Sequence, residues 1–201
     1  MIDRLITTWD DYSVHNERLA ALLKKYDLYA TFFIEIFPQY HDGTDTDAKN
    51  QIKSLHEQGF DIGSHSMTHP RDMKLLNDAK LKYEIFESKL LLEELLQVTI
   101  TDFCYPRGRY DLRAIELLKK VGYTYARTTE IKDDIVSGDP FRAPTSVHVF
   151  QRKEYDGKHW LEYAKKKWDK GGMFHLWGHA WEIDRDNQWD ALENFFKYIT
   201  N

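Results

Sequence analysis

Two histidines spaced four residues apart are the side chains in this sequence best suited to bind a metal ion. His65 and His69 frame the segment HSMTH, and in a helical turn their rings would lie on one side. Asp10 and Asp11 form an adjacent carboxylate pair at the end of the apolar stretch 5–9. Asp11 and the two histidines together offer one oxygen and two nitrogen ligands, which suit a single divalent ion. We expect Zn²⁺, with Co²⁺, Mn²⁺ or Fe²⁺ as alternatives.

The second carboxylate of the pair is available for a different task. Successive side chains of a strand point to opposite faces, so Asp10 and Asp11 need not serve the same function. A zinc ion with three protein ligands keeps one position open and lowers the pKa of a bound water to about 7. Asp10 would then act as the general base that takes a proton from this metal-activated water. The alternative is that Asp11 caps the first helix and that both histidines are ordinary loop residues.

The composition is that of one ordinary globular domain. The chain has 201 residues, of which 42% are hydrophobic and 30% charged, and we expect a single domain over residues 1–201. A net charge of −5 without a clustered basic face gives no reason to expect a nucleic-acid partner. Cys104 is the only cysteine, so we expect neither an internal disulfide nor a cysteine-based metal site.

Membrane and export segments are also not expected. No apolar run approaches the roughly 20 residues that are needed to cross a bilayer. The first residues lead directly into an apolar strand and lack the pattern of a signal peptide. The chain as given is therefore expected in the cytoplasm, or outside the cell if a leader has been removed.

Short β-branched or aromatic segments alternate with helical patterns along the whole chain. A helix that follows each strand predicts a parallel sheet with helices outside it, and about seven such units favour a closed or nearly closed barrel. Asp111 is expected to cap one of the helices, which ends at Gly122. The expected strands cover 5–9, 29–37, 60–64, 100–105, 123–127, 145–150 and 173–179.

Polar residues follow several of these strands at the point where each strand ends. In parallel barrels the carboxyl ends of the strands carry the chemistry. The Asp10-Asp11 pair, His65, the turn 105–108 and His179 are all placed at this rim. His175 lies on the same face of its strand as His179, and we expect it to be a buried core histidine.

The motifs TWDD (8–11), HSMTH (65–69) and FCYPRG (103–108) resemble the first three motifs of the polysaccharide deacetylase family, the NodB-homology carbohydrate esterases of family 4. The segment LWGH (176–179) resembles the last motif of that family. The resemblance spans residues 5 to 182. It implies a distorted (β/α)7 barrel, NodB-like, with a single domain, and metal-dependent removal of acetyl groups from sugars.

The resemblance also implies a role for each motif residue. Asp10 matches the catalytic base, and the backbone N–H of Arg107 matches the group that stabilises the oxyanion. His179 matches the general acid that protonates the leaving amine, a group that amide hydrolysis requires. The implied metal ligands are Asp11, His65 and His69. The side chains expected to contact the substrate are Tyr105, Trp177, Trp181 and Arg142.

Several residues depart from the family pattern. Cys104 and Tyr105 stand where many members carry Arg and Pro, so the arginine that orients the base is missing from its usual place. Arg142 is a candidate to supply that charge. The acidic fourth motif, which tunes the acid histidine, is not recognisable, and its candidate substitutes are Asp139, Glu182 and Asp184. Tyr12 replaces the glycine that usually follows the Asp pair.

Three functions remain open from the sequence. The first is a metal-dependent deacetylase that acts on N-acetylated sugars, as polymers or oligomers. The second is a hydrolase of small cyclic amides or other non-peptide C–N bonds on the same barrel. The third is a barrel that binds carbohydrate without catalysis. The retained Asp10 and His179 argue against the third function, because binding alone needs neither a base nor an acid.

Overall fold

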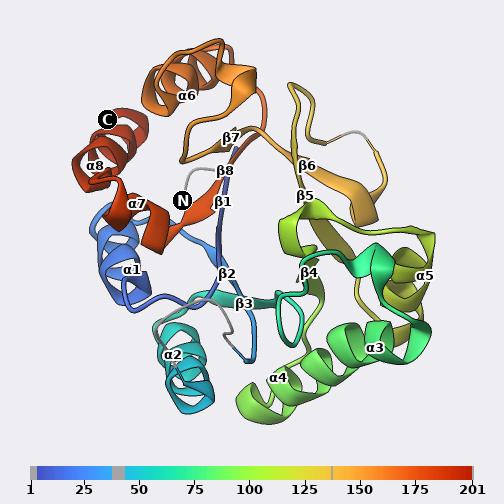
Figure 1. Cartoon of the computed structure of the whole chain (residues 1–201). Coiled ribbons are helices and arrows are strands. Elements are labelled where there is room, and N and C mark those ends of the chain that lie inside the picture. Colours follow the sequence, from blue (N-terminus) through green and yellow to red (C-terminus); the bar gives the residue numbers. More distant parts are fainter. Residues whose placement is uncertain (1–3, 38–43, 137, 201) are drawn as a thin grey trace.

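A parallel sheet curled into a nearly closed barrel forms the centre of the molecule (Figure 1). The computed structural model describes residues 4–37, 44–136 and 138–200. Within them the strand order is β6-β5-β4-β3-β2-β1-β8-β7, and every neighbouring pair is parallel. The strands are β1 (Leu5–Asp10), β2 (Thr31–Ile34), β3 (Asp61–Ser64), β4 (Asp102–Cys104), β5 (Tyr125–Ile131), β6 (Ala143–Thr145), β7 (Val147–His148) and β8 (Phe174–His179).

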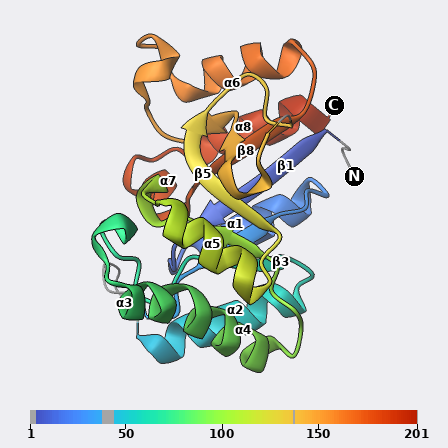
Figure 2. The same ribbon diagram turned by 90° about the vertical axis from the view of Figure 1, so that its right-hand side faces the viewer.

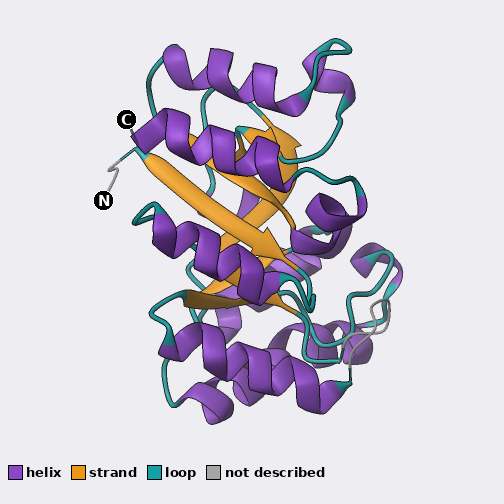
Figure 3. Ribbon diagram, turned by 90° about the vertical axis from the view of Figure 1, so that its left-hand side faces the viewer, coloured by secondary structure: helices purple, strands orange, loops and turns teal. Residues whose placement is uncertain are grey.

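Helices surround this sheet on its outer side (Figures 2 and 3). The longer helices show an apolar face toward the strands, which is the reason a parallel sheet in a small domain is covered on its outside. None of the described helices is long and apolar enough to span a bilayer. The helices are α1 (Asn16–Lys25), α2 (Asp45–Glu57), α3 (Asp78–Lys82), α4 (Ser88–Leu96), α5 (Leu112–Val121), α6 (Trp160–Asp169), α7 (Ala180–Arg185) and α8 (Trp189–Thr200).

The predicted alternation of strands and helices is confirmed, with one strand divided. The expected strand 145–150 is two short strands, because the chain changes partner at Ser146. Residues before Ser146 pair with β5, whereas residues after it pair with β8. The backbone N–H of Ser146 donates to His175 O at 2.9 Å, and the N–H of His175 donates back to Ser146 Oγ at 3.0 Å. These two bonds fix the junction of the two edge strands, β6 and β7, against β8, and the barrel is nearly closed.

The helix expected after the third strand is interrupted by a turn of different geometry, and this turn carries a residue that supports the site. The segment Tyr83–Glu87 forms a π-helical turn between α3 and α4. Single π-turns inside helices are frequent at functional sites because they redirect side chains. Here the turn includes Glu84, whose buried carboxylate accepts hydrogen bonds from the N–H groups of Met67 (3.0 Å) and Thr68 (2.9 Å). It therefore holds the loop between His65 and His69.

Local sequence features set the two ends of α5. Asp111 caps α5 as expected, since its side chain accepts a hydrogen bond from Ala114 N at 3.1 Å, and Gly122 ends that helix with a φ of +91°.

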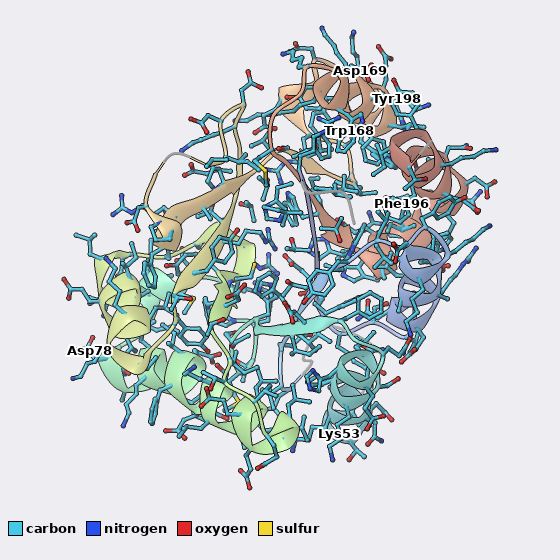
Figure 4. The ribbon with its side chains drawn as sticks, turned by 180° about the vertical axis from the view of Figure 1, so that it is seen from behind. Lys53, Asp78, Trp168, Asp169, Phe196 and Tyr198 are labelled. Atoms are coloured by element: carbon cyan, nitrogen blue, oxygen red, sulfur yellow. The ribbon has the colours of Figure 1, made fainter. Side chains whose placement is uncertain are left out.

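At the opposite side of the molecule α8 is held to α6. Tyr198 donates a hydrogen bond to Asp169 at 2.8 Å, and both side chains are seen together with Trp168 in Figure 4. Most of the buried apolar side chains form one continuous core.

Candidate metal centre and active site

Asp11 lies directly beyond the end of β1, where the backbone turns sharply. Its φ is +70°, a conformation that a non-glycine residue adopts only when its surroundings hold it there. Its backbone N–H donates to Phe33 O at 3.0 Å, and its carbonyl accepts from Asn16 Nδ2 at 3.0 Å. The indole N–H of Trp181 donates to Asp11 Oδ2 at 3.0 Å. These bonds position the buried carboxylate with Oδ1 toward the two histidines.

His65 and His69 meet Asp11 at a single point. Asp11 Oδ1 is 3.5 Å from His65 Nε2 and 3.6 Å from His69 Nε2. Because a carbonyl oxygen can only accept, the 2.8 Å contact between His65 Nδ1 and Cys104 O places the proton on Nδ1 and leaves the lone pair on Nε2. The predicted convergence of the three residues is confirmed. Their loop is irregular rather than a helical turn, with positive φ at Ser66 (+72°) and His69 (+51°).

The donor set fits a divalent metal ion. The three side chains are buried, and the ligand atoms are close enough together for one ion to bind them all. Burial lowers the pKa of His65, and it lowers the pKa of His69 to about 4, with the neighbouring His65 adding to the effect. Both rings are therefore neutral near pH 7 and have a lone pair to offer, as metal ligation requires. The hydrogen bond from His65 to a backbone carbonyl is the outer support that metal-binding histidines usually have.

Asp10 is held by an arginine that the sequence did not reveal as its partner. Arg127 of β5 is fully buried and donates from Nη2 to Asp10 Oδ2. Burial acts to raise the pKa of Asp10, but the charges of Arg127, His65 and His179 and the hydrogen bond from Arg127 together outweigh it, and the pKa is lowered. Asp10 Oδ1 has no hydrogen-bond partner among the described residues. The carboxylate is thus ionised, with one oxygen fixed and the other available.

The proposed role of Arg142 at Asp10 is therefore wrong. Arg142 is exposed, and its Nε is 3.7 Å from Asp139 Oδ2. Asp139 caps the short 3-10 helix Pro140–Arg142. Arg142 does not line the cavity described below. Arg127 is paired in register with Cys104 across β4 and β5, and its Nη2 is 2.9 Å from the Cys104 sulfur. In the family pattern described above, the arginine that orients the base stands at the position of Cys104, on β4. Here the guanidinium reaches Asp10 from β5, the next strand.

His179 ends β8 and is paired with Glu182. Its Nδ1 is 2.5 Å from Glu182 Oε2, and its Nε2 faces Asp11 Oδ2 at 3.8 Å. Burial acts to lower the pKa of His179, but the hydrogen bond with Glu182 and the charge of Asp11 raise it to about 9. Burial likewise acts to raise the pKa of Glu182, and its bonds to His148 and His179 lower it to about 2. Of the three acidic candidates for the missing fourth motif, Glu182 is the one that contacts the histidine.

The turn after β4 lies at the same rim. Arg107 has a φ of +57°, and Gly108 follows with a φ of +66°. A Cβ on Gly108 would come within 2.3 Å of Thr129 Oγ1, so only glycine allows β5 to approach this closely. The turn thus places Arg107 against the cavity.

A cavity of about 550 Å³ collects these groups. Trp177 forms part of its wall and stacks on His148, with 3.8 Å between ring centroids and 8° between planes. Tyr105 does not reach it: the ring is fully buried, and its hydroxyl donates to Phe141 O at 3.0 Å, so the expected substrate contact is wrong. The lining residues are Asp10, Asp11, His65, His69, Arg107, Thr129, His148, Arg152, Trp177, His179 and Trp181.

Two other features refine the site. His175 is a buried core histidine, as predicted, with Nε2 2.9 Å from Thr8 Oγ1. Asp10, His65 and Cys104 also bring possible ligand atoms together, but burial raises the pKa of the Cys104 thiol and Arg127 contacts both Asp10 and Cys104. A neutral thiol beside a guanidinium is a poor place for a cation.

The sequence interpretation missed Arg127, Glu84 and Arg152. Arg127 was at the end of a predicted strand, at the rim where polar residues were sought, so its position was a usable sign. Glu84 had no such sign, because the π-helical turn inside the expected helix was not anticipated, and Arg152 lies in a connection between two expected elements.

Fold and site together define a nearly closed parallel α/β barrel with a buried Asp–His–His cluster at the carboxyl ends of its strands. The sequence model of the family described as polysaccharide deacetylase matches residues 3–126. The chain belongs to this family.

Known proteins are similar to this chain in sequence or in fold. "Putative polysaccharide deacetylase YxkH" of Bacillus subtilis (strain 168) is 30% identical over 129 residues, which are 63% of this chain and 44% of that protein. The chain thus spans less than half of that relative's length. A "putative polysaccharide deacetylase" from Mycobacterium smegmatis has a similar fold, with a TM-score of 0.72 at 18% identity over 98% of this chain and 84% of that one. A CE4 family pseudoenzyme from Bacillus anthracis gives a TM-score of 0.67 at 15% identity over 96% and 59%.

Proposed function

We propose that this protein is a metal-dependent deacetylase that removes an acetyl group from an N-acetylated sugar, as a polymer or an oligomer. One observation carries the proposal. Beside the Asp11–His65–His69 cluster, Arg127 donates to Asp10, whose pKa is lowered, and Glu182 Oε2 lies 2.5 Å from Nδ1 of His179, whose pKa is raised. An ionised carboxylate and a protonated imidazole at one cluster are the base and the acid that amide hydrolysis needs.

Asp11, His65 and His69 would hold the ion. Two imidazoles and one carboxylate suit Zn²⁺, and Co²⁺, Mn²⁺ or Fe²⁺ accept the same ligands. Such an ion lowers the pKa of a water ligand and polarises a carbonyl oxygen.

Asp10 and His179 then move the protons. Arg127 fixes Asp10 Oδ2, so Oδ1 accepts the proton of the water as the water oxygen bonds to the acetyl carbon. Glu182 holds Nδ1 of His179, so the proton on Nε2 goes to the leaving nitrogen as the C–N bond breaks. The products are acetate and the amino sugar. In this proposal the backbone N–H of Arg107 stabilises the oxyanion, and Trp177 and Trp181 contact the substrate.

The pair of Asp10 and His179 distinguishes an enzyme from a barrel without catalysis, but it does not distinguish a deacetylase from a hydrolase of cyclic amides. A hydrolase of cyclic amides would use the same base and acid, and the cavity of about 550 Å³ could accept such a molecule. A barrel without catalysis also has a precedent, because a CE4 family pseudoenzyme has a fold similar to that of this chain. In this chain, however, Asp10 and His179 keep the supports that set their protonation states. Their retention favours an enzyme.

Acetate release tests the proposal. Metal-loaded protein is assayed on chitooligosaccharides, acetylated peptidoglycan fragments and an aryl acetate, beside Asp10→Asn and the control Asp139→Asn, whose residue is outside the cavity. We expect release by the wild type and the control and a loss of roughly 10²-fold or more in Asp10→Asn. Release that Asp10→Asn leaves untouched would overturn the mechanism. Turnover of a cyclic imide without acetate release would instead support the cyclic-amide hydrolase.

A further inference from the structure

A second group of metal-ligating side chains lies on the other side of the His179 ring. While Nε2 of His179 faces Asp11, Nδ1 faces Glu182 Oε2 at 2.5 Å. His148 Nε2 is 3.0 Å from the same Oε2 and 3.4 Å from His179 Nδ1. Two nitrogens and one carboxylate oxygen from β7, β8 and α7 therefore meet at one point.

We propose that His148, His179 and Glu182 form a second divalent metal site, which fills when metal is in excess and slows the reaction. The existence of the site rests on these three residues alone. Its effect on the rate rests on the function proposed above, in which His179 is the acid.

The spacing of the ligand atoms fits an ion. Ligands about 2.0–2.1 Å from a tetrahedral Zn²⁺ are roughly 3.3 Å from one another, and two histidines with one glutamate are a known zinc donor set. The distances of 3.0 Å and 3.4 Å are already close to this value. Only the 2.5 Å contact between His179 and Glu182 must widen, by less than about 1 Å on the same geometry.

The other two proposed ligands, His148 and Glu182, are held in place by their surroundings. His148 is buried and stacked on Trp177, and its backbone N–H donates to Tyr155 Oη at 2.7 Å. Its ring can therefore present Nε2 without a large loss of conformational freedom. Glu182 is also buried, and its lowered pKa keeps the carboxylate ionised.

Competing charges make this site weaker than the one at Asp11. The guanidinium of Arg152 is close enough to affect His148. The charge of Arg185 likewise acts on Glu182, because that carboxylate is among the groups that affect Arg185. Both cations oppose a second positive ion. The ion must also displace the proton on His179 Nδ1, which is released to solvent. We therefore expect the second site to fill only after the first.

An ion on Nδ1 changes the acid. The His179 imidazolium becomes a metal-bound imidazole whose remaining proton, on Nε2, is much harder to lose than that of an imidazolium. Glu182 is at the same time drawn to the ion. The leaving nitrogen then receives its proton more slowly.

Metal stoichiometry tests the site independently of activity. Metal-free protein is equilibrated with increasing Zn²⁺, and the bound ion is quantified in the wild type, His148→Phe, Glu182→Gln and the control His56→Asn. His148→Phe keeps a ring against Trp177 but removes the donor atoms, and His56 lies on α2, outside the cavity. We expect two ions in the wild type and the control, and one in each of the other two. A single ion in the wild type at every concentration, or two ions retained in both variants, would overturn the proposal.

The rate provides the second readout. Excess Zn²⁺ should reduce acetate release by the wild type by roughly 10²-fold at saturation, the contribution of a general acid. Two bound ions without any loss of rate would show that the second ion leaves the acid intact, which overturns the inhibitory role. If no acetate is released under any condition, the function proposed above fails, and the stoichiometry still decides whether the site exists.

Discussion

Asp10 and His179 are register partners on the adjacent strands β1 and β8, yet their pKa values are shifted in opposite directions. Each is set by a different neighbour from elsewhere in the chain. Arg127 keeps Asp10 ionised, and Glu182 keeps His179 protonated. The two strands thus bring the proposed base and the proposed acid side by side, and their supports come from β5 and α7.

The first prediction concerns the pH dependence of the reaction. Activity requires ionised Asp10 and protonated His179, so kcat/KM should fall on the alkaline side as His179 loses its proton, and the hydrogen bond with Glu182 moves that fall to higher pH. Glu182→Gln removes a group that raises the pKa of His179, so the alkaline fall should move to lower pH. A pH–rate profile of both proteins checks this. An unchanged alkaline limb in Glu182→Gln would contradict the assignment of His179 as the acid.

The second prediction concerns stability at Arg127. Arg127→Met leaves the buried Asp10 carboxylate uncompensated, which should lower the free energy of unfolding by about 3–5 kcal/mol near pH 7. The deficit should shrink in acid, because Asp10 without its partner protonates more readily and a neutral carboxyl carries no buried charge. Urea unfolding at several pH values measures this. The exposed Arg142→Met is the control. If its free energy of unfolding changed by more than about 0.5 kcal/mol, the loss in Arg127→Met could not be assigned to the buried charge of Asp10.

The third prediction exchanges two neighbouring positions. Cys104 and Arg127 are register partners, and either strand could present a guanidinium to Asp10. Arg127→Cys should lose most activity, and adding Cys104→Arg should restore part of it, a coupling that a double-mutant cycle measures. Additive losses in the double variant would mean that the charge must come from β5.

The fourth prediction concerns the tight metal ion. His65→Ala and His69→Ala should each lose it, whereas His56→Asn should keep it. In the wild type the ion should also raise the unfolding free energy, by about 2.7 kcal/mol when its free concentration is 100 times Kd. Metal analysis after dialysis and thermal unfolding with and without Zn²⁺ provide two measurements. Full retention of one tightly bound ion in His65→Ala would place the ligands elsewhere.

The fifth prediction concerns the loop that carries both histidines. Glu84 accepts three hydrogen bonds from Met67 and Thr68, so Glu84→Gln should leave part of the loop unsupported. We expect metal affinity to fall 10- to 100-fold, the usual effect of losing an outer support. Competition with a chelator measures it, with the exposed Glu94→Gln as control. Equal affinities in the two variants would remove Glu84 from this role.

The convergence of Asp11, His65 and His69 could be predicted from the sequence because each lies in a short motif at the end of a strand. The sheet class could be predicted for a similar reason, since the alternation of strands and helices is local. The partner of Asp10 could not. Arg127 is 117 positions away, and only the register between β4 and β5 brings it beside Cys104. Ser146 is a comparable case, because the change of strand partner depends on pairing rather than on composition.

The register between Cys104 and Arg127 has a consequence for how such proteins are compared. A guanidinium can reach the same carboxylate from a neighbouring strand when the residue paired with it, here Cys104, is small. Along the chain this looks like the loss of the arginine beside Asp10, whereas across the sheet the contact between Arg127 and Asp10 is present. Chains that lack the motif arginine are therefore best sorted by what stands at the matching position of the next strand before they are set aside as inactive.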